Sequence, residues 1–467
     1  MPTDIHIAIL GAGPGGYVAA IRAAQYGARV TVIEREALGG MCLNWGCIPS
    51  KALLSVVELG EKVRKAEAMG LRIHGAVTYD LPRMIQRKND VVGTLVKGIA
   101  TLFRTWGIVH LQGTGRLVNE RTIHVAKPDG SETTVQADAI ILATGTNWPN
   151  LPMFPIDGKH VLTSKEALDL TRVPETILIV GGGVEGCEFA CLFSGLGARV
   201  TVVEMMPTVL PFEDEEVSAF LTRELKRRGV EVLTGTTVAH VGLEKGLVHA
   251  ELSSGQRLDA EIALISIGRT FNTAGIGLDA VGVQLGPRGE VAVDERMQTT
   301  VPGIYAIGDL VGKAMLAHVA SAQGKVAVAN ILGRPIAFDE RVIPAGIFTL
   351  PEIGRVGLTE QQAREQGRSV VVGRFKYAGL GKGHAVDETT GLFKVIADAG
   401  TKTILGVHIV GTHATDLVHE AALAMQMGAT ADTIGSMIHA HPTFAEGLME
   451  AAEDVEGFAI HQARKRI

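Results

Sequence analysis

The chain has 467 residues, of which 46% are hydrophobic, and a formal net charge of −6 at pH 7. This length is about three times that of a typical domain, so we expect several domains. Charges of both signs are mixed along the chain, and no apolar run approaches the ~18 residues of a membrane span, which argues against nucleic-acid and membrane partners. No cationic segment precedes the first apolar strand, so we expect a cytoplasmic location.

An internal repeat organises the first half of the chain. The sequence GARVTVIE at residues 27–34 recurs as GARVTVVE at residues 197–204, and an apolar strand and a glycine cluster precede each copy. The helices between them are predicted to run roughly from Tyr17 to Tyr26 and from Cys187 to Leu196, each ended by a glycine. The chain therefore contains two copies of one strand–turn–helix–strand unit.

Each predicted turn carries a GxGxxG pattern, followed by a glutamate at the end of the next strand. Such glycines allow a tight turn, close approach of a pyrophosphate to the helix N-terminus, and close helix–strand packing. Glu34 and Glu204 can each accept hydrogen bonds from ribose hydroxyls. Two bound dinucleotides are expected, the alternative being two ordinary turns with surface glutamates.

Glu204 also bears on the choice of nicotinamide dinucleotide. Its carboxylate would repel a 2′-phosphate, and the following Met-Met-Pro at residues 205–207 contains no arginine to bind one. The sequence favours NAD over NADP.

Two of the four cysteines lie in CLNWGCIPSK, residues 42–51. A turn containing Gly46 could bring Cys42 and Cys47 within disulfide range. Pro49 suits the first turn of a helix, which places Cys47 near the positive helix end and favours a thiolate, and Lys51 adds a second positive charge. A zinc site is the competing interpretation, but no second ligand pair lies nearby. Two inert buried cysteines are the remaining alternative.

The other two cysteines, Cys187 and Cys191, lie four residues apart among apolar neighbours on the predicted helix of the second unit. This pattern favours core packing over chemistry.

Together, CLNWGCIPSK, the two glycine patterns, Gly308-Asp309 and the segment HAHPTFAE at residues 439–446 resemble the dihydrolipoamide dehydrogenases of the pyridine nucleotide–disulfide oxidoreductase family, over essentially the whole chain. The resemblance implies an α/β fold with two Rossmann-like dinucleotide-binding domains, a central domain and a C-terminal α+β dimerisation domain. The expected boundaries are 1–150 for the FAD-binding domain, 151–270 for the NAD-binding domain, 271–340 for the central domain completing the FAD site, and 341–467 for the dimerisation domain.

The same resemblance implies catalytic roles. Cys47 would lie against the flavin as the charge-transfer thiolate, while Cys42 exchanges with the lipoyl disulfide. Lys51 would lie beside the flavin, paired with Glu188. His441, oriented by Glu446, would be the catalytic base and act on the active site of the other subunit.

The implied cofactor ligands follow the two glycine patterns and a few later positions. The FAD-binding residues are Gly11, Gly13, Pro14, Gly15, Gly16, Glu34, Arg35, Gly40, Met41, Cys42, Lys51, Gly115, Thr144, Gly145, Asp309 and Ala317. The NAD-binding residues are Gly181, Gly182, Gly183, Val184, Glu185, Gly186, Glu188, Glu204, Val238 and Gly268.

The C-terminal motif has a second interpretation. Thr443 followed by Glu446 is also typical of a helix capping box, in which case His439 and His441 are ordinary loop histidines.

The implied activity is oxidation of dihydrolipoamide on a lipoyl protein, with tightly bound FAD and NAD as cofactors and no metal. A homodimer is expected, with the lipoyl and subunit-binding domains of an acyltransferase, or a glycine-cleavage carrier protein, as partners. A glutathione reductase would need arginines after Glu204, a mercuric reductase would need cysteines after Cys191, and a soluble transhydrogenase lacks the second motif cysteine. A flavin-loaded binding subunit with little turnover is the alternative from another class.

Overall fold

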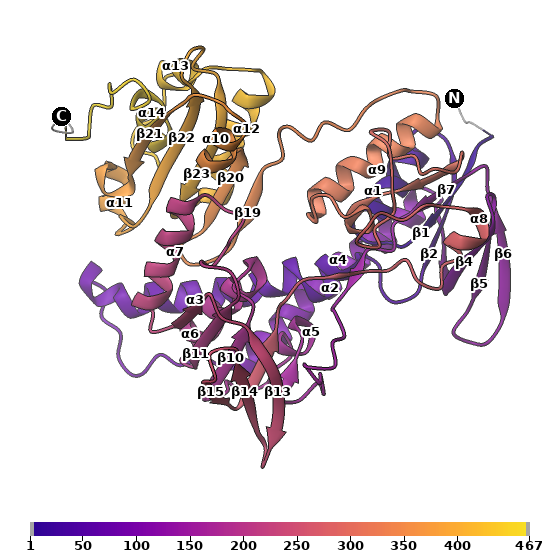
Figure 1. Ribbon diagram of the computed structural model, residues 1–467, viewed down its shortest axis with the longest axis horizontal. Coiled ribbons are helices and arrows are strands. Elements are labelled where there is room, and N and C mark those ends of the chain that lie inside the picture. Colours follow the sequence, from indigo (N-terminus) through magenta and orange to yellow (C-terminus); the bar gives the residue numbers. More distant parts are fainter. Residues whose placement is uncertain (1–3, 464–467) are drawn as a thin grey trace.

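The structure is a computed structural model that describes residues 4–463. Figure 1 shows three lobes: the N-terminal unit at the right, the second unit at the bottom, and the C-terminal region in yellow at the upper left. The long helix α3 (Cys47–Lys65) runs from the first unit alongside the second.

The first unit is built on a parallel sheet with strand order β18-β7-β1-β2-β3. All residues of β1 are buried, as expected for a parallel strand covered on both faces. The edge strand β18 comes from the region after the second unit, so that later segment completes the first sheet. The strands are β1 (His6–Leu10), β2 (Arg29–Glu34), β3 (Val109–Gln112), β7 (Ala139–Leu142) and β18 (Ile304–Ala306).

The second unit repeats this design with strand order β12-β11-β10-β16-β9, again all parallel. β10 pairs with β11 as β1 pairs with β2, which confirms the predicted repeat. The strands are β9 (Val161–Leu162), β10 (Thr176–Val180), β11 (Arg199–Glu204), β12 (Glu231–Thr234) and β16 (Ile262–Ile265).

The helices of the two units begin three residues earlier than the sequence pattern predicted. Helix α1 spans Pro14–Gln25 and helix α6 spans Val184–Leu196. Gly13 and Gly183 have extended backbone and act as the N-caps, so the residues after them already form the first helical turn. The third glycine of each GxGxxG pattern, Gly16 and Gly186, therefore lies inside the helix.

Helix α9 (Ala317–Ile331) lies beside α1 (Figure 1), and small residues line the contact between them. A Cβ atom at Gly324 would lie 2.8 Å from the Gly15 carbonyl oxygen and 3.1 Å from the Ala19 Cβ. Only glycine allows the two backbones this close. The central region is thus packed directly on the first turn of the first unit.

A short ribbon connects the two units. β8 (Thr146–Asn147) leads out of the first unit and pairs antiparallel with β17 (Thr270–Phe271), which leads back from the second. Each unit also carries a three-stranded antiparallel sheet, described by the orders β4-β5-β6 and β13-β14-β15. Their strands are β4 (Thr114–Asn119), β5 (Thr122–Ala126), β6 (Glu132–Gln136), β13 (Val238–Glu244), β14 (Leu247–Leu252) and β15 (Arg257–Ala260).

The C-terminal region is an antiparallel sheet of order β19-β20-β23-β22-β21 with helices packed on it, which confirms the α+β expectation. The exact domain boundaries remain a prediction. The strands are β19 (Ala345–Ile347), β20 (Ile353–Gly357), β21 (Val370–Lys376), β22 (Leu392–Asp398) and β23 (Ile404–Val410). The helices include α10 (Glu360–Glu365), α11 (Gly381–Ala385), α12 (Ala414–Gln426), α13 (Ala431–Gly435) and α14 (Glu446–Glu453).

A buried ion network ties the second unit to the C-terminal sheet next to helix α7 (Glu215–Arg227). The Lys394 side chain on β22 is 2% exposed, and its Nζ donates to Asp214 Oδ1 and Glu216 Oε1, both at 2.8 Å. Arg374 Nε donates to the same Glu216 at 2.9 Å. Since a buried charge is costly unless paired, these contacts hold the two regions in one arrangement.

Across residues 4–463, no helix combines the length and the apolar sequence needed to cross a bilayer.

Candidate redox site

The site begins where two helices meet at a glycine. Helix α2 (Gly40–Trp45) ends at Gly46, and α3 begins at Cys47. This break brings the Cα atoms of Cys42 and Cys47 to 4.7 Å, and the two residues form a disulfide. A Cβ at Gly46 would lie 3.2 Å from the Met41 carbonyl oxygen, so a larger residue would disturb the turn. The predicted turn is confirmed.

Cys47 lies at the positive end of a helix. It is the first residue of α3, and Pro49 and Ser50 are buried in the same turn. The Ser50 hydroxyl donates to the Gly46 carbonyl oxygen at 2.8 Å, which fixes the turn before the cysteine. The helix end stabilises negative charge, so this position suits a thiolate when the disulfide is reduced.

Lys51, one turn further along α3, connects the disulfide helix to the second unit. Its Nζ lies 2.6 Å from Glu188 Oε2 on α6 and 4.6 Å from the centroid of the Phe348 ring. Glu188 Oε1 accepts a hydrogen bond from the Phe348 amide at 2.9 Å. The predicted pair is present, and three segments distant in sequence meet at it.

The first glycine turn has the features of a pyrophosphate site. The positive φ of Gly11, 104°, is one that side chains rarely adopt, and the N-terminus of α1 carries no side-chain cap. A Cβ at Gly13 would meet nothing closer than Gly40 Cα at 4.0 Å, so the turn is open to a ligand. Glu34 Oε2 accepts from the Ala12 amide at 2.8 Å, which holds its carboxylate against the turn. These features fit one end of FAD.

Asp309 provides a second point of fit to the flavin. Its Oδ2 accepts a hydrogen bond from Thr146 Oγ1 at 3.3 Å. Burial raises the pKa of Asp309 above its ordinary value, while the nearby Arg269 opposes this shift. A partly buried carboxyl that accepts one long hydrogen bond within the described residues has capacity left for a polar ligand group, such as a ribitol hydroxyl.

The other predicted flavin residues are spread around this turn. Thr144 Oγ1 donates to the Asn272 carbonyl oxygen at 2.9 Å, and the Gly145 carbonyl accepts from the Asn272 amide at 3.0 Å. Gly115 on β4 packs against Leu10. Arg35 is exposed and interacts with Glu36.

Further predicted positions lie at helix starts. Pro14 and Ala317 are the first residues of α1 and α9, and Gly15 and Gly16 lie in the first turn of α1. Met41 contacts the guanidinium of Arg269.

The second glycine turn repeats the first. Gly181 has φ of 107°, and a Cβ at Gly183 would meet no atom within 4 Å. Glu204 Oε2 accepts from the Gly182 amide at 2.6 Å. Gly186 packs directly on the carbonyl of Gly181, so the helix approaches the strand as closely as in the first unit. The residues fit a second dinucleotide such as NAD.

The remaining predicted nicotinamide residues differ in their surroundings. Val184 is exposed, whereas Val238 is buried in an apolar cluster together with Val203. Gly268 has room for a side chain but a φ of 109°. Glu185 and Glu188 lie three residues apart on α6.

Sequence reasoning missed a polar chain between the two turns. Arg269 Nε donates to Thr146 Oγ1 at 3.2 Å, and the guanidinium carbon lies 5.0 Å from the centroid of the Trp148 ring. Trp148 Nε1 donates to Ser164 Oγ at 2.9 Å. Arg269 directly follows Gly268, a predicted ligand, and this adjacency was the signal available in the sequence.

His441 and Glu446 form the predicted pair. His441 Nδ1 lies 2.9 Å from Glu446 Oε1, and the His441 side chain is 75% exposed. Burial raises the pKa of Glu446, but hydrogen bonds from the Thr443 amide and from His441 outweigh it and hold this pKa below its ordinary value. An ionised Glu446 can only accept, so Nδ1 carries the hydrogen and Nε2 of the neutral ring is free to take a proton.

The capping interpretation of this motif is also partly present. Glu446 opens α14, and its Oε2 accepts from the Thr443 amide at 2.8 Å. The Thr443 hydroxyl, however, donates to the Ala440 carbonyl oxygen, and α14 begins after Ala445 without a side-chain cap, so the other half of a capping box is missing from this turn. One carboxylate thus both holds the turn and orients the histidine. In a single chain, no hydrogen bond or ion pair within residues 4–463 joins His441 to the cysteine pair.

Cys187 and Cys191 are free and fully buried, as expected of core residues. Burial raises the pKa of Cys191 to about 11, so its thiol stays protonated and unreactive.

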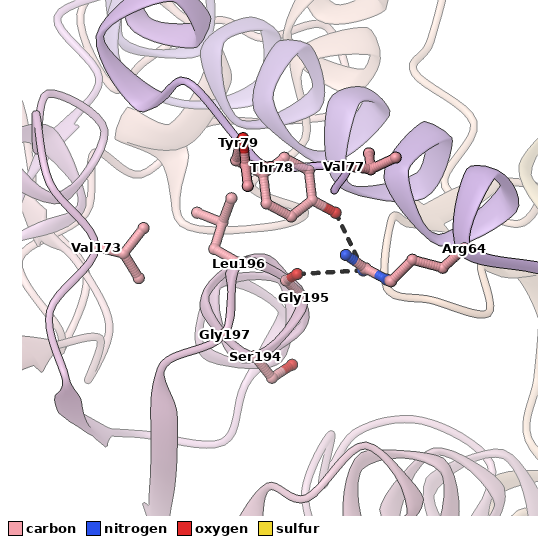
Figure 2. A pocket seen from close by; sticks show the side chains of 9 residues that line it. All are labelled: Arg64, Val77, Thr78, Tyr79, Val173, Ser194, Gly195, Leu196 and Gly197. Carbon is pink, nitrogen blue, oxygen red and sulfur yellow. Dashed lines mark hydrogen bonds between the residues drawn. The ribbon is translucent and has the colours of Figure 1, made fainter. Parts of the chain in front are cut away.

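A cavity of about 480 Å³ lies elsewhere, at the seam between α3 and the end of α6 (Figure 2). Arg64 there donates to the Tyr79 hydroxyl at 3.1 Å and to the Gly195 carbonyl at 3.4 Å. No predicted site residue lines it, so it is separate from the redox site. Its lining residues are Arg64, Val77, Thr78, Tyr79, Val173, Ser194, Gly195, Leu196 and Gly197.

Comparisons with known proteins agree with this geometry. Residues 5–324 match the family model described as pyridine nucleotide-disulphide oxidoreductase, and residues 343–452 match its dimerisation domain, which supports a homodimer. The chain is 40% identical to a dihydrolipoyl dehydrogenase of Chlorobaculum tepidum over 97% of each chain. It is also 40% identical to one of Bacillus subtilis, covering 99% of this chain and 100% of that one.

Solved structures give the same picture. LpdA from Mycobacterium tuberculosis superposes with a TM-score of 0.91 at 29% identity, over 97% of this chain and 99% of that chain. The flavoprotein disulfide reductase RclA from Escherichia coli superposes with a TM-score of 0.86 at 26% identity, over 96% and 99%. The chain therefore belongs to the pyridine nucleotide–disulfide oxidoreductase family and is a redox enzyme that uses FAD and NAD.

Proposed function

We propose that the chain acts as a dihydrolipoyl dehydrogenase, which oxidises protein-bound dihydrolipoamide and reduces NAD⁺. The observation that carries this proposal is the Cys42–Cys47 disulfide at the start of α3, joined through Lys51 and Glu188 to the second dinucleotide unit. Relatives bearing that activity in their names are about as long as this chain and 40% identical to it.

The chemistry at the cysteine pair is thiol–disulfide exchange. A substrate thiolate attacks Cys42 Sγ, forms a mixed disulfide, and displaces Cys47 as a thiolate. The second substrate thiolate then attacks the substrate sulfur of the mixed disulfide, which releases lipoamide and leaves two electrons on the cysteine pair. FAD, when bound, accepts this electron pair and supplies the hydride chemistry that reduces NAD⁺.

The chain's own residues lower the barriers to this exchange. The N-terminus of α3 and the nearby Lys51 stabilise the Cys47 thiolate as it leaves. Attack requires a deprotonated substrate thiol, and His441 Nε2 of the partner subunit takes that proton while Glu446 holds the ring.

We also expect the partners to be the lipoyl and subunit-binding domains of an acyltransferase, or a glycine-cleavage carrier protein, in the cytoplasm. The chemical basis is that dihydrolipoamide reaches this enzyme class attached to a carrier.

A substrate panel tests the proposed activity. The purified holoenzyme is assayed with dihydrolipoamide and NAD⁺, with NADP⁺ in place of NAD⁺, with glutathione disulfide and NADPH, and with Hg²⁺ and NADPH. We expect turnover with the first combination to exceed turnover with the others at least 100-fold. The reason is that the chain lacks the residues that would recognise the other substrates. Preference for glutathione disulfide or Hg²⁺ would contradict the proposal.

Mixing two inactive variants tests whether the base comes from the partner. Cys47→Ser and His441→Gln homodimers are unfolded together and refolded, so that about half of the dimers are hybrids with one complete site if Cys47 and His441 act across the interface. We expect about a quarter of wild-type activity. If both residues act within one chain, no hybrid site is complete and no activity returns.

A further inference from the structure

One of the differences between the two glycine turns is a change of charge in the first helical turn. Gly15 of the first unit corresponds to Glu185 of the second. A Cβ at Gly15 would lie 3.2 Å from the Ala320 carbonyl oxygen and 3.1 Å from Ile307 Cδ1, because the central region packs on it. In the second unit, the same position carries a partly exposed carboxylate side chain.

Glu185 is surrounded by polar groups from several segments. It lies one helical turn before Glu188, so both carboxylates share a face of α6. Burial raises the pKa of Glu185, whereas Ser164, the first residue of α5 (Ser164–Ala167), and the more distant Arg269 and Lys51 act to lower this pKa and so stabilise the charged form. The carboxylate therefore lies where side chains of the first unit, such as Lys51, and of the second unit, such as Ser164, approach each other.

A nicotinamide dinucleotide bound to the second unit would extend past this position. The pyrophosphate belongs at the Gly181–Gly186 turn, where the helix amides are free of side-chain caps. The redox-active ring must reach the side of α3 that carries the disulfide, where Lys51 meets Glu188. Glu185 lies at the start of α6, one turn before Glu188, so a ring that reaches Lys51 and Glu188 would pass close to it.

The ring changes charge in the reaction. The pyridinium of NAD⁺ carries one positive charge, whereas the dihydropyridine of NADH is neutral. A nearby carboxylate in a partly buried site attracts the first and not the second. We propose that Glu185 is a specificity-determining residue that favours binding of NAD⁺ over NADH and so limits inhibition by the product. This proposal rests on the NAD-dependent function proposed above.

Arg269 does not cancel this effect. Its guanidinium is hydrogen-bonded to Thr146, and it is attracted by Asp309 as well as by Glu185. Lys51 is paired with Glu188, so the two cations Arg269 and Lys51 face three carboxylates, Glu185, Glu188 and Asp309, which leaves negative charge for the pyridinium. Because burial raises the pKa of Glu185 above its ordinary value, the test is made at pH 8 to favour the ionised carboxylate.

The test is a binding measurement on the oxidised holoenzyme, which reacts with none of the probes. Calorimetry gives the dissociation constants of NAD⁺, of tetrahydro-NADH as an unreactive neutral-ring analogue, and of ADP-ribose, which lacks the ring. For Glu185→Gln we expect NAD⁺ to bind about tenfold more weakly, with tetrahydro-NADH and ADP-ribose unchanged within about twofold. The matched control is Glu215→Gln, an exposed carboxylate in the first turn of α7, which should change none of the three.

The outcomes are distinct. Equal weakening of all three ligands, or no change in any, would overturn the role of Glu185. Glu185→Ala must reproduce the selective loss, and the flavin spectrum and melting temperature of each variant verify folding. If the wild-type enzyme binds none of the three probes, the proposed function itself fails, and the inference fails with it.

Discussion

The two dinucleotide units share one design and differ in what contacts their first helical turn. Glu34 accepts from the amides of Ala12 and Glu36 at 2.8 and 2.7 Å. Glu204 accepts from the amides of Gly182 and Met206 at 2.6 and 2.7 Å. The strand, turn and glutamate are thus copies down to individual hydrogen bonds.

Their attachments to the rest of the molecule are unlike. Helix α9 packs on the first unit through Gly15 and Gly324, with backbones in direct contact. The second unit packs on α3 through an apolar cluster that includes Leu53, Val57 and Phe189. Ion pairs add to this contact, including Lys51–Glu188 at 2.6 Å and Lys394–Asp214 at 2.8 Å. The comparison teaches that one local sequence design takes on different functions through its surroundings. In the first unit a helix packs directly on the glycine turn, whereas in the second unit ion pairs are added to apolar packing.

The largest expected effect is the difference in turnover between replacing a cysteine of the first unit and replacing one of the second. Cys47→Ser removes the leaving thiolate, so we expect dihydrolipoamide turnover to fall at least 1000-fold while the protein keeps its flavin. The measurements are NADH formation and the visible spectrum.

The control is Cys191→Ser in the second unit. Its Sγ is buried and accepts only from the Leu350 amide at 3.4 Å. We expect activity within about twofold of wild type and a loss of about 1–2 kcal/mol in the free energy of unfolding. A large loss of turnover here would mean that the second pair also carries electrons.

The next effect concerns the charged attachment of the second unit. Lys394→Met leaves Asp214 and Glu216 without their buried cation, so we expect the free energy of unfolding to fall by about 3–5 kcal/mol. Urea unfolding followed by circular dichroism measures it. A change below about 1 kcal/mol would show that the network adds little.

A smaller effect compares the matched turn positions. Gly15→Ala places a Cβ 3.2 Å from the Ala320 carbonyl, so we expect a loss of about 1–3 kcal/mol in the free energy of unfolding and reduced flavin content. Glu185→Ala truncates a side chain in a more open position and should cost less than about 1 kcal/mol. Similar losses at both positions would remove the structural distinction between the units.

The smallest effect is a pH dependence of the second unit. Hydrogen bonds from Arg374 lower the pKa of Glu216 from 4.5 to about 2. Because the folded-state pKa is lowered, its contribution to stability is present above about pH 4.5 and is lost as the pH falls towards 2. The stability difference between wild type and Glu216→Gln should therefore shrink across this interval in urea titrations. A difference that stays constant with pH would contradict the assigned cause.

Local features were predictable because neighbouring residues determine them. The repeated glycine turns, the glutamates that follow them and the turn at Gly46 each depend on a few adjacent positions. The helix starts were placed three residues late because Pro14 and Val184 were assigned to the loop, although glycine N-caps place them in the helix.

Contacts between distant segments could not be predicted in the same way. The polar contacts from Arg269 through Trp148 to Ser164 join residues that are far apart in the sequence. Their geometry depends on how the two units pack together. The pairing of Lys394 with Asp214 likewise connects a central strand to another lobe. The available signal was Lys394 itself, a lysine within an otherwise apolar strand. This signal predicts that an acidic partner exists, but it does not predict which residue it is.

The most direct test of the redox assignment labels the thiols. Oxidised holoenzyme and enzyme reduced anaerobically with NADH are treated with iodoacetamide, and each cysteine is scored by peptide mass spectrometry. We predict labelling of Cys42 and Cys47 only after reduction, and no labelling of buried Cys187 and Cys191 unless the protein is denatured. If NADH leaves Cys42 and Cys47 unlabelled while the flavin is reduced, electrons do not pass between the nucleotide and this disulfide, and the account is wrong.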